Sequence, residues 1–192
     1  RQTKEGGVDT VQTVQSETRT GTQPEFDAIV IGAGVAGLYQ LYMLRQLGLR
    51  VRTFETGSAV GGTWYWNRYP GARFDSESWT YGYSFSKELL EEWAWEEHFS
   101  AQPHTERYLN YVADKFDLRR DIQFNSRVTS AHWSEETRSW ELVLESGARH
   151  STRHAMNPRR SRRCAPAFPL QRLMRRFRRM RQPLGVGNRQ RR

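Results

Sequence analysis

The chain has 192 residues, a mass of 22.6 kDa and a formal net charge of +9 at pH 7. This length suits one domain with extended ends and argues against two complete domains. A single cysteine, Cys164, excludes an internal disulfide framework and a multi-cysteine metal site, so we expect no metal and a reducing, cytoplasmic setting. No apolar run approaches the roughly 20 residues that cross a bilayer, so we expect no membrane association.

The positive charge is confined to one end of the chain. Residues 154–192 contain 13 arginines and no Asp or Glu, whereas the chain before them carries more acidic than basic residues. The basicity of the whole chain therefore says nothing about the partners of the folded part. We expect a disordered arm at residues 1–25, a domain at residues 26–153 and a basic tail at residues 154–192.

The first predicted elements form a strand, a helix and a second strand. Residues 28–31 are a short apolar run typical of a strand buried in a parallel sheet, and residues 38–47 carry apolar side chains at helical spacing. Gly48 stands where a helix C-terminus favours glycine, and residues 51–55 suit a second strand. Such a crossover is right-handed and its two strands are parallel.

The sequence pattern is less regular in the rest of the domain. Residues 57–86 are rich in Gly, Pro, Trp and Tyr without a sustained period, which indicates a long loop region. Residues 87–99 and 105–116 predict helices that pack on the sheet, residues 128–144 an antiparallel hairpin, and residues 149–153 the start of another strand. The predicted fold class is α/β: a Rossmann-like FAD-binding domain with a parallel sheet, flanking helices and a hairpin, incomplete at its C-terminal edge.

A glycine motif, residues 32–37, follows the first strand and opens the helix, and Glu55 ends the next strand. Gly32 permits a tight turn, Gly34 removes a side chain that would block a pyrophosphate, and Gly37 lets the helix approach the sheet. The helix N-terminus favours a bound anion, and a carboxylate at Glu55 accepts hydrogen bonds from a ribose. The motif predicts FAD or NAD rather than NADP; a glycine-rich turn that binds nothing is the alternative.

The most unusual stretch is Gly61-Gly62-Thr63-Trp64-Tyr65-Trp66-Asn67-Arg68-Tyr69-Pro70-Gly71. Two interpretations stay open on physical grounds. The aromatic side chains belong to a surface loop pinned to a core, or they form a flat wall for a planar ring system, with the glycines admitting a phosphate or ribose.

These two motifs, together with Ala72-Arg73-Phe74-Asp75, Tyr83-Ser84-Phe85-Ser86 and Tyr111-Val112-Ala113-Asp114, resemble the N-terminal FAD domain of type I Baeyer–Villiger monooxygenases. The resemblance covers about residues 26–153 and extends to phenylacetone, cyclohexanone and steroid monooxygenases. It implies a flavoprotein in which NADPH reduces FAD and dioxygen then converts a small-molecule ketone into an ester or lactone. The protein positions and shields a cofactor that carries the chemistry.

The resemblance also implies roles for individual residues. The glycines would hold the pyrophosphate, Glu55 the ribose, residues 63–66 the flavin, and the backbone of Val128 the adenine end. Asp75 is the implied catalytic residue, because its counterpart binds an active-site arginine; the alternative is a cap for a short helix beginning at Ser76. The implied cofactor-binding set is Gly32, Gly34, Val35, Gly37, Glu55, Gly61, Gly62, Thr63, Trp64, Tyr65, Trp66, Arg73, Phe74, Asp75, Tyr81 and Val128.

The chain departs from the family pattern after Arg153. The second dinucleotide-binding segment for NADPH, the arginine that pairs with Asp75 and the fingerprint F-x-G-x-x-x-H-x-x-x-W are missing. Residues 154–160 replace an apolar strand of the family, and we expect them not to pair in the sheet. We interpret the chain as an inactive, truncated monooxygenase with a frameshifted tail. The alternatives are a basic arm that binds nucleic acid or an anionic membrane, and a flavin-binding module without catalysis.

Overall fold

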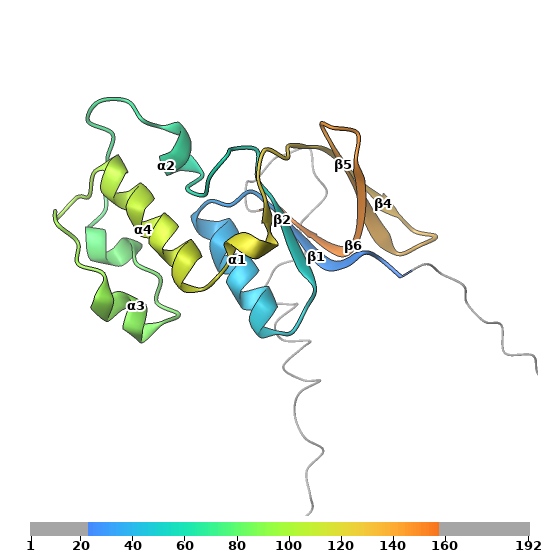
Figure 1. Cartoon of the computed structure of the whole chain (residues 1–192), viewed down its shortest axis with the longest axis horizontal. Coiled ribbons are helices and arrows are strands. Elements are labelled where there is room, and N and C mark those ends of the chain that lie inside the picture. Colours follow the sequence, from blue (N-terminus) through green and yellow to red (C-terminus); the bar gives the residue numbers. More distant parts are fainter. Residues whose placement is uncertain (1–22, 158–192) are drawn as a thin grey trace, which may run out of the picture.

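The computed structural model describes residues 23–157, and these residues form one mixed sheet with helices packed against it (Figure 1). The sheet has six strands in the order β3-β2-β1-β6-β5-β4. β3, β2, β1 and β6 run parallel, and β5 and β4 continue the sheet as antiparallel neighbours. The strands are β1 (Phe26–Ile31), β2 (Val51–Phe54), β3 (Ile122–Gln123), β4 (Val128–Ser134), β5 (Ser139–Leu144) and β6 (Arg149–Met156).

Four helices and two short 3-10 turns connect these strands. Figure 1 shows α1, α3 and α4 together on one side of the strands, with the β4–β5 hairpin at the far end of the sheet. A large apolar core joins α1 and α4 to the sheet, and a smaller one around Ile29, Phe54, Leu142 and Leu144 lies on the other face. The helices are α1 (Val35–Gln46), α2 (Thr63–Trp66), α3 (Lys87–Glu92) and α4 (Gln102–Lys115), and the turns are η1 (Ser78–Tyr81) and η2 (Arg119–Asp121).

The structure confirms the predicted strand–helix–strand unit and the hairpin. β1 and β2 pair in parallel, and α1 connects them. α1 ends at Gln46, and Gly48 has a φ of +73°, a left-handed value that suits glycine at a helix end. β4 and β5 pair antiparallel from Val128 with Leu144 to Ser134 with Ser139. The local pattern of these segments was sufficient: β1 is a short apolar run buried on both faces, and α1 buries Leu38, Leu41 and Leu44 at helical spacing.

The helix predicted over residues 87–99 is wrong in its second half. α3 ends at Glu92, and the backbone of Trp93 is extended. The rings of Trp93 and Trp95 instead pack around Tyr108, at centroid distances of 5.2 and 5.0 Å. Burying two indole rings against α4 outweighs the few hydrogen bonds that a longer exposed helix would add.

The expectation that residues 154–160 do not pair is also wrong where the structure describes them. β6 continues to Met156 and pairs in parallel with β1, with Ile29 opposite Ala155 and Val30 opposite Met156. The Met156 side chain is buried in the main core. Because the backbone makes the hydrogen bonds between strands, this strand needs no continuous apolar run. Burial of Thr152 and Met156 on one face is sufficient for it to pack in the sheet. The predictions for residues 1–22 of the arm and for residues 158–192 lie outside the described residues.

Candidate functional site

The glycine loop lies at the C-terminal end of β1, between the neighbouring strands β2 and β6. Open α/β sheets bind ligands at such a point, where the chain leaves the sheet in opposite directions. Gly32 has a φ of +97°, and its N–H donates to the Phe54 carbonyl at 2.8 Å. A Cβ on Gly37 would lie 1.9 Å from the Gly32 carbonyl oxygen. Any side chain at Gly37 would therefore push α1 away from the loop.

Glu55 ties this loop to the segment that follows β2. The residue is only 5% exposed. Its Oε2 accepts the Ala33 N–H at 2.6 Å, and its Oε1 accepts the Gly57 N–H at 2.7 Å. Hydrogen bonds from neutral N–H groups to a carboxylate are strong, and each oxygen keeps further acceptor capacity. The Glu55 carboxylate is therefore fixed in the loop and still able to accept hydroxyl donors.

The segment just before β4 lies beside Glu55 and Gly57. The Ser126 N–H donates to the Glu55 carbonyl at 2.8 Å, and the Asn125 N–H donates to the Gly57 carbonyl at 3.0 Å. Val128 follows two residues later and is half-buried. The structure therefore brings the segment before Val128 next to Glu55, although 70 residues separate them in the sequence.

The second glycine pair packs directly on the first glycine loop. The Gly61 N–H donates to the Ala33 carbonyl at 3.1 Å. Gly62 has a φ of +54°, and a Cβ on it would lie 2.8 Å from the Gly34 Cα. The two motifs are separate in the sequence, and no sequence signal gives the distance between them. The structure joins them into one backbone-lined surface at the N-terminus of α1.

The aromatic stretch does not form one wall, because its side chains point in different directions. Trp64 is 7% exposed, and its Nε1 donates to the Tyr81 hydroxyl at 2.6 Å. Phe74 stacks on Tyr81 with a centroid distance of 4.6 Å and meets the Trp64 ring edge-on. Burial raises the pKa of Tyr81, and the hydrogen bond from Trp64 opposes this. These three rings therefore form a core cluster.

Tyr65 and Trp66 lie outside that cluster. The Tyr65 ring packs on Gly57, where a Cβ would lie 2.7 Å from the ring, and its hydroxyl shares a 2.9 Å hydrogen bond with the Ser58 hydroxyl. This hydrogen bond lowers the pKa of Tyr65. Trp66 is 53% exposed and meets the Tyr65 ring edge-on, and Thr63 is also exposed. Of the four residues 63–66, Thr63 and Trp66 present their side chains mainly to solvent.

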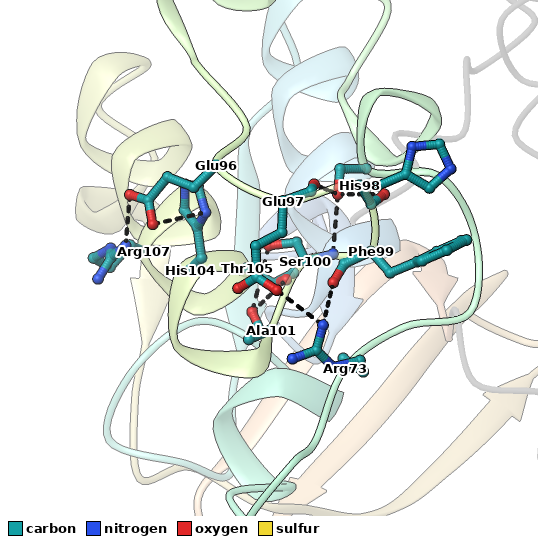
Figure 2. Close-up of polar contacts among 11 residues, drawn as sticks. Arg73, Glu96, Glu97, His98, Phe99, Ser100, Ala101, His104, Thr105 and Arg107 are labelled. Atoms are coloured by element: carbon teal, nitrogen blue, oxygen red, sulfur yellow. Dashed lines mark hydrogen bonds and ion pairs between the residues drawn. The ribbon is translucent and has the colours of Figure 1, made fainter.

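Arg73 and Asp75 are both exposed, but their surroundings differ. Arg73 Nη1 donates to the Glu97 carboxylate and to the Phe99 carbonyl, each at 2.9 Å, as Figure 2 shows. Asp75 makes no hydrogen bond or ion pair with any of the described residues. The 3-10 turn begins at Ser78 and has Glu77 at its N-cap position, so the alternative of Asp75 as a helix cap is wrong.

Two tyrosines, Tyr83 and Tyr108, hold this region together through hydrogen bonds that the sequence did not indicate. The Tyr83 hydroxyl donates to the Val35 carbonyl in the first turn of α1 at 2.6 Å. The Tyr108 hydroxyl accepts the Tyr83 N–H at 2.7 Å. Burial raises the pKa of Tyr108 to about 12 and the pKa of Tyr83 well above its usual value. A tyrosine in a loop carries no sequence signal for such a bond, since its partner is a distant backbone atom.

Residues 23–157 contain neither a metal-binding cluster nor a membrane-spanning helix. No group of three or more His, Cys, Asp or Glu side chains there is arranged to hold a metal ion. Among the helices of the same residues, none combines the length and the apolar character of a membrane span.

A parallel strand, a glycine loop packed on a helix N-terminus, a second strand and a fixed acidic residue together define a Rossmann-like dinucleotide-binding domain. Residues 30–91 match the family described as NAD(P)-binding Rossmann-like domain. The chain is 55% identical over 121 residues to an acetone monooxygenase (methyl acetate-forming) of Gordonia sp. (strain TY-5), covering 63% of this chain and 23% of that relative.

A Baeyer–Villiger monooxygenase of Pseudooceanicola batsensis is 47% identical over 135 residues, which cover 70% of this chain and 25% of the relative. A solved structure of OTEMO in complex with FAD and NADP superposes with a TM-score of 0.68 at 46% identity, over 71% of this chain and 26% of that one. Over this segment the chain is similar in sequence and in fold to Baeyer–Villiger monooxygenases. It spans about a quarter of the length of these relatives.

Proposed function

We propose that the described domain is the FAD-binding part of a monooxygenase that uses FAD, NADPH and dioxygen to convert small ketones into esters or lactones. The joined glycine loops at the end of β1, fixed by the buried Glu55 carboxylate, are the observation that carries this proposal. The names of the relatives support it: one forms methyl acetate from acetone, and OTEMO was solved with FAD and NADP.

The residues of the loop fit the diphosphate of a dinucleotide. Gly34 is the N-cap of α1, no side chain caps the helix, and its first turn contains no acidic residue. The first N–H groups of a helix have no partner within it, so the N–H groups of α1 remain as donors for an anion. Gly32 and Gly34 have no side chain that could block the approach of a ligand to these N–H groups. The N-terminus of α1 is therefore both electropositive and open to close approach.

The other predicted residues divide by position. FAD, when bound, supplies the electron-transfer and oxygen chemistry. We propose that Glu55 accepts the ribose hydroxyls and that the segment at Val128 borders the adenine. The cluster of Trp64, Phe74 and Tyr81 supports the backbone of residues 61–66 on the flavin side. Asp75, exposed and without a partner among the described residues, is proposed to hold a cationic side chain near the reacting groups.

The proposed cellular setting is the cytoplasm, because the chain has a single cysteine.

The activity proposed for the isolated chain is narrower than that of its relatives. Because the chain spans about a quarter of their length, we expect the 192-residue chain to bind FAD without oxygenating ketones. Incubation of the purified chain with FAD, NADPH and acetone should yield no methyl acetate by gas chromatography. Formation of ester above the level of a chain-free control would contradict this expectation.

Titration of the purified chain with FAD tests the cofactor site directly. We expect quenching of flavin fluorescence to saturate, and we expect Glu55→Gln to weaken binding about tenfold, because the amide replaces one acceptor oxygen by a donor that faces a backbone N–H. Glu136→Gln is the matched control, since Glu136 is exposed in the β4–β5 turn and makes no side-chain hydrogen bond with the described residues. A chain that binds no FAD, or equal weakening in both variants, would contradict the proposed site.

A further inference from the structure

Ser78 has a hydrogen-bond arrangement that neither the family resemblance nor the proposed function explains. The residue begins η1 and is fully buried. Its hydroxyl reaches the carbonyls of Glu97 at 2.6 Å and His98 at 3.0 Å, and it accepts the Ser100 N–H at 3.0 Å. The Ser78 N–H also donates to the His98 carbonyl at 2.8 Å. One buried hydroxyl therefore binds the backbone of three residues within a stretch of four.

These residues belong to a segment between α3 and α4 that we name the strap, residues 96–101. Besides Ser78, contacts at both ends fix the strap. The Glu96 carboxylate lies 3.2 Å from Arg107 and 3.7 Å from His104 on α4, as Figure 2 shows. At the other end, Ala101 forms an antiparallel bridge with Arg73. The strap has no regular secondary structure between these points. Its middle is held by the buried hydrogen bonds of Ser78, beside exposed contacts of His98 with Glu77 and Trp79.

The middle of the strap is also what holds the Arg73 side chain. Both acceptors of Arg73 Nη1, the Glu97 carboxylate and the Phe99 carbonyl, lie on it. The Phe99 carbonyl stands between the Ser78-bound carbonyl of His98 and the Ser78-bound N–H of Ser100. An exposed ion pair contributes little on its own, so the orientation of Arg73 depends on how firmly this carbonyl is placed.

The bound guanidinium keeps donors free. Arg73 is 48% exposed, and only its Nη1 donates to the described residues. A guanidinium has five N–H donors in one rigid plane, so fixing Nη1 also fixes the directions of Nε–H and the Nη2 hydrogens. A cation held in this way binds an anionic or carbonyl oxygen at less cost in side-chain entropy than a freely rotating arginine.

We infer that Ser78 is a positioning residue, which acts through the strap to orient Arg73 toward bound FAD. The inference rests on the proposed function, since it takes FAD as the ligand of this site. A purely structural role for Ser78 would stabilise the domain without any dependence on Arg73. The two roles therefore differ in whether the effect of removing the Ser78 hydroxyl requires the arginine.

A double-mutant cycle in the 192-residue chain separates them, with the dissociation constant of FAD from flavin fluorescence as the measurement. We expect Arg73→Ala to weaken FAD binding. We expect Ser78→Ala to weaken it about fivefold when Arg73 is present, and by less than about 1.5-fold in the Arg73→Ala chain. The visible circular dichroism of bound flavin should change with Ser78→Ala only when Arg73 is present.

Ser100→Ala is the matched control. Ser100 is equally buried and lies on the same strap, but its hydroxyl reaches only the Ala101 carbonyl, at 3.5 Å. We expect this variant to bind FAD as the unchanged chain does. If Ser78→Ala does not fold, Ser78→Cys keeps nearly the same volume with a much weaker hydrogen-bond donor, and the same cycle is run with it.

Three results would overturn the inference: equal weakening by the Ser78 variant with and without Arg73, unchanged FAD affinity in Arg73→Ala, or a Ser100→Ala chain that is weakened as much as Ser78→Ala. A failure of the proposed function looks different, because the unchanged chain then binds no FAD at all. That result removes the inference together with the cofactor site.

Discussion

The β1–α1–β2 unit and the segment of residues 57–101 reach the same site by different means. The first is held by regular ladders, a helix and a glycine whose replacement would clash with its own loop. The second has little regular structure and is held by ring contacts and single hydrogen bonds, among them those of Trp64, Ser78 and Tyr83. Regular secondary structure therefore positions the proposed phosphate-binding loop, whereas individual side-chain contacts position the segment proposed to lie beside the flavin.

The largest expected effect comes from the aromatic segment. Trp64→Ala removes a buried indole from its contacts with Phe74 and Tyr81, and we expect a loss of about 3–5 kcal/mol in the free energy of unfolding. Trp66→Ala, two residues away and exposed, should change it by less than about 0.5 kcal/mol. Urea unfolding followed by fluorescence measures both. Similar losses of unfolding free energy in the two variants would contradict the burial of Trp64 and the exposure of Trp66.

The next largest effect tests the regular unit. Gly37→Ala places a Cβ against the Gly32 carbonyl oxygen, and we expect it to cost about 3 kcal/mol or more, because the helix must move from the loop. Gly147→Ala is the control: a Cβ there meets nothing within 4 Å, although its φ of +85° carries a strain of about 1 kcal/mol. If both variants unfold at the same urea concentration, the close approach of α1 to the loop is not limiting.

The smallest expected effect concerns Tyr108, which connects α4 to the aromatic segment. Burial raises its pKa to about 12, from the usual value of 10, and the hydrogen bond from the Tyr83 N–H opposes this rise. Between pH 10 and 12 the unfolded chain therefore loses the phenol proton before the folded chain does. The stability linked to this proton is fully present below pH 10 and falls as the pH rises.

Tyr108→Phe tests this sign. At pH 7 we expect it to cost about 1 kcal/mol, because the Tyr83 N–H loses its acceptor. From pH 10 to 12 its free energy of unfolding should fall less steeply than that of the unchanged chain. Urea unfolding at intervals across this range gives both curves, and parallel curves would contradict the assigned shift.

Most of the fold was predictable where a short segment repeats its own pattern. β1, α1, β2 and the hairpin follow from periodicity and glycine placement, and the position of Glu55 follows from the end of β2. The second half of the helix predicted over residues 87–99 failed, because the rings of Trp93 and Trp95 pack on α4. The prediction that the chain does not pair in the sheet after Arg153 was wrong as far as Met156. Strand pairing uses backbone groups, which every residue except proline supplies in full.

The amino-acid sequence by itself determined the dinucleotide-binding unit, since its glycines stand at the turn into α1 and the position of Glu55 follows from the end of the next strand. Only the tertiary structure decided that the two glycine motifs touch, that Trp64 faces the core while Trp66 faces solvent, and that Ser78 holds the strap against Arg73. The physical reason is the range of the interactions. A turn or a helix depends on residues a few positions apart, whereas a ring contact or a buried hydroxyl depends on partners that only the folded chain brings together.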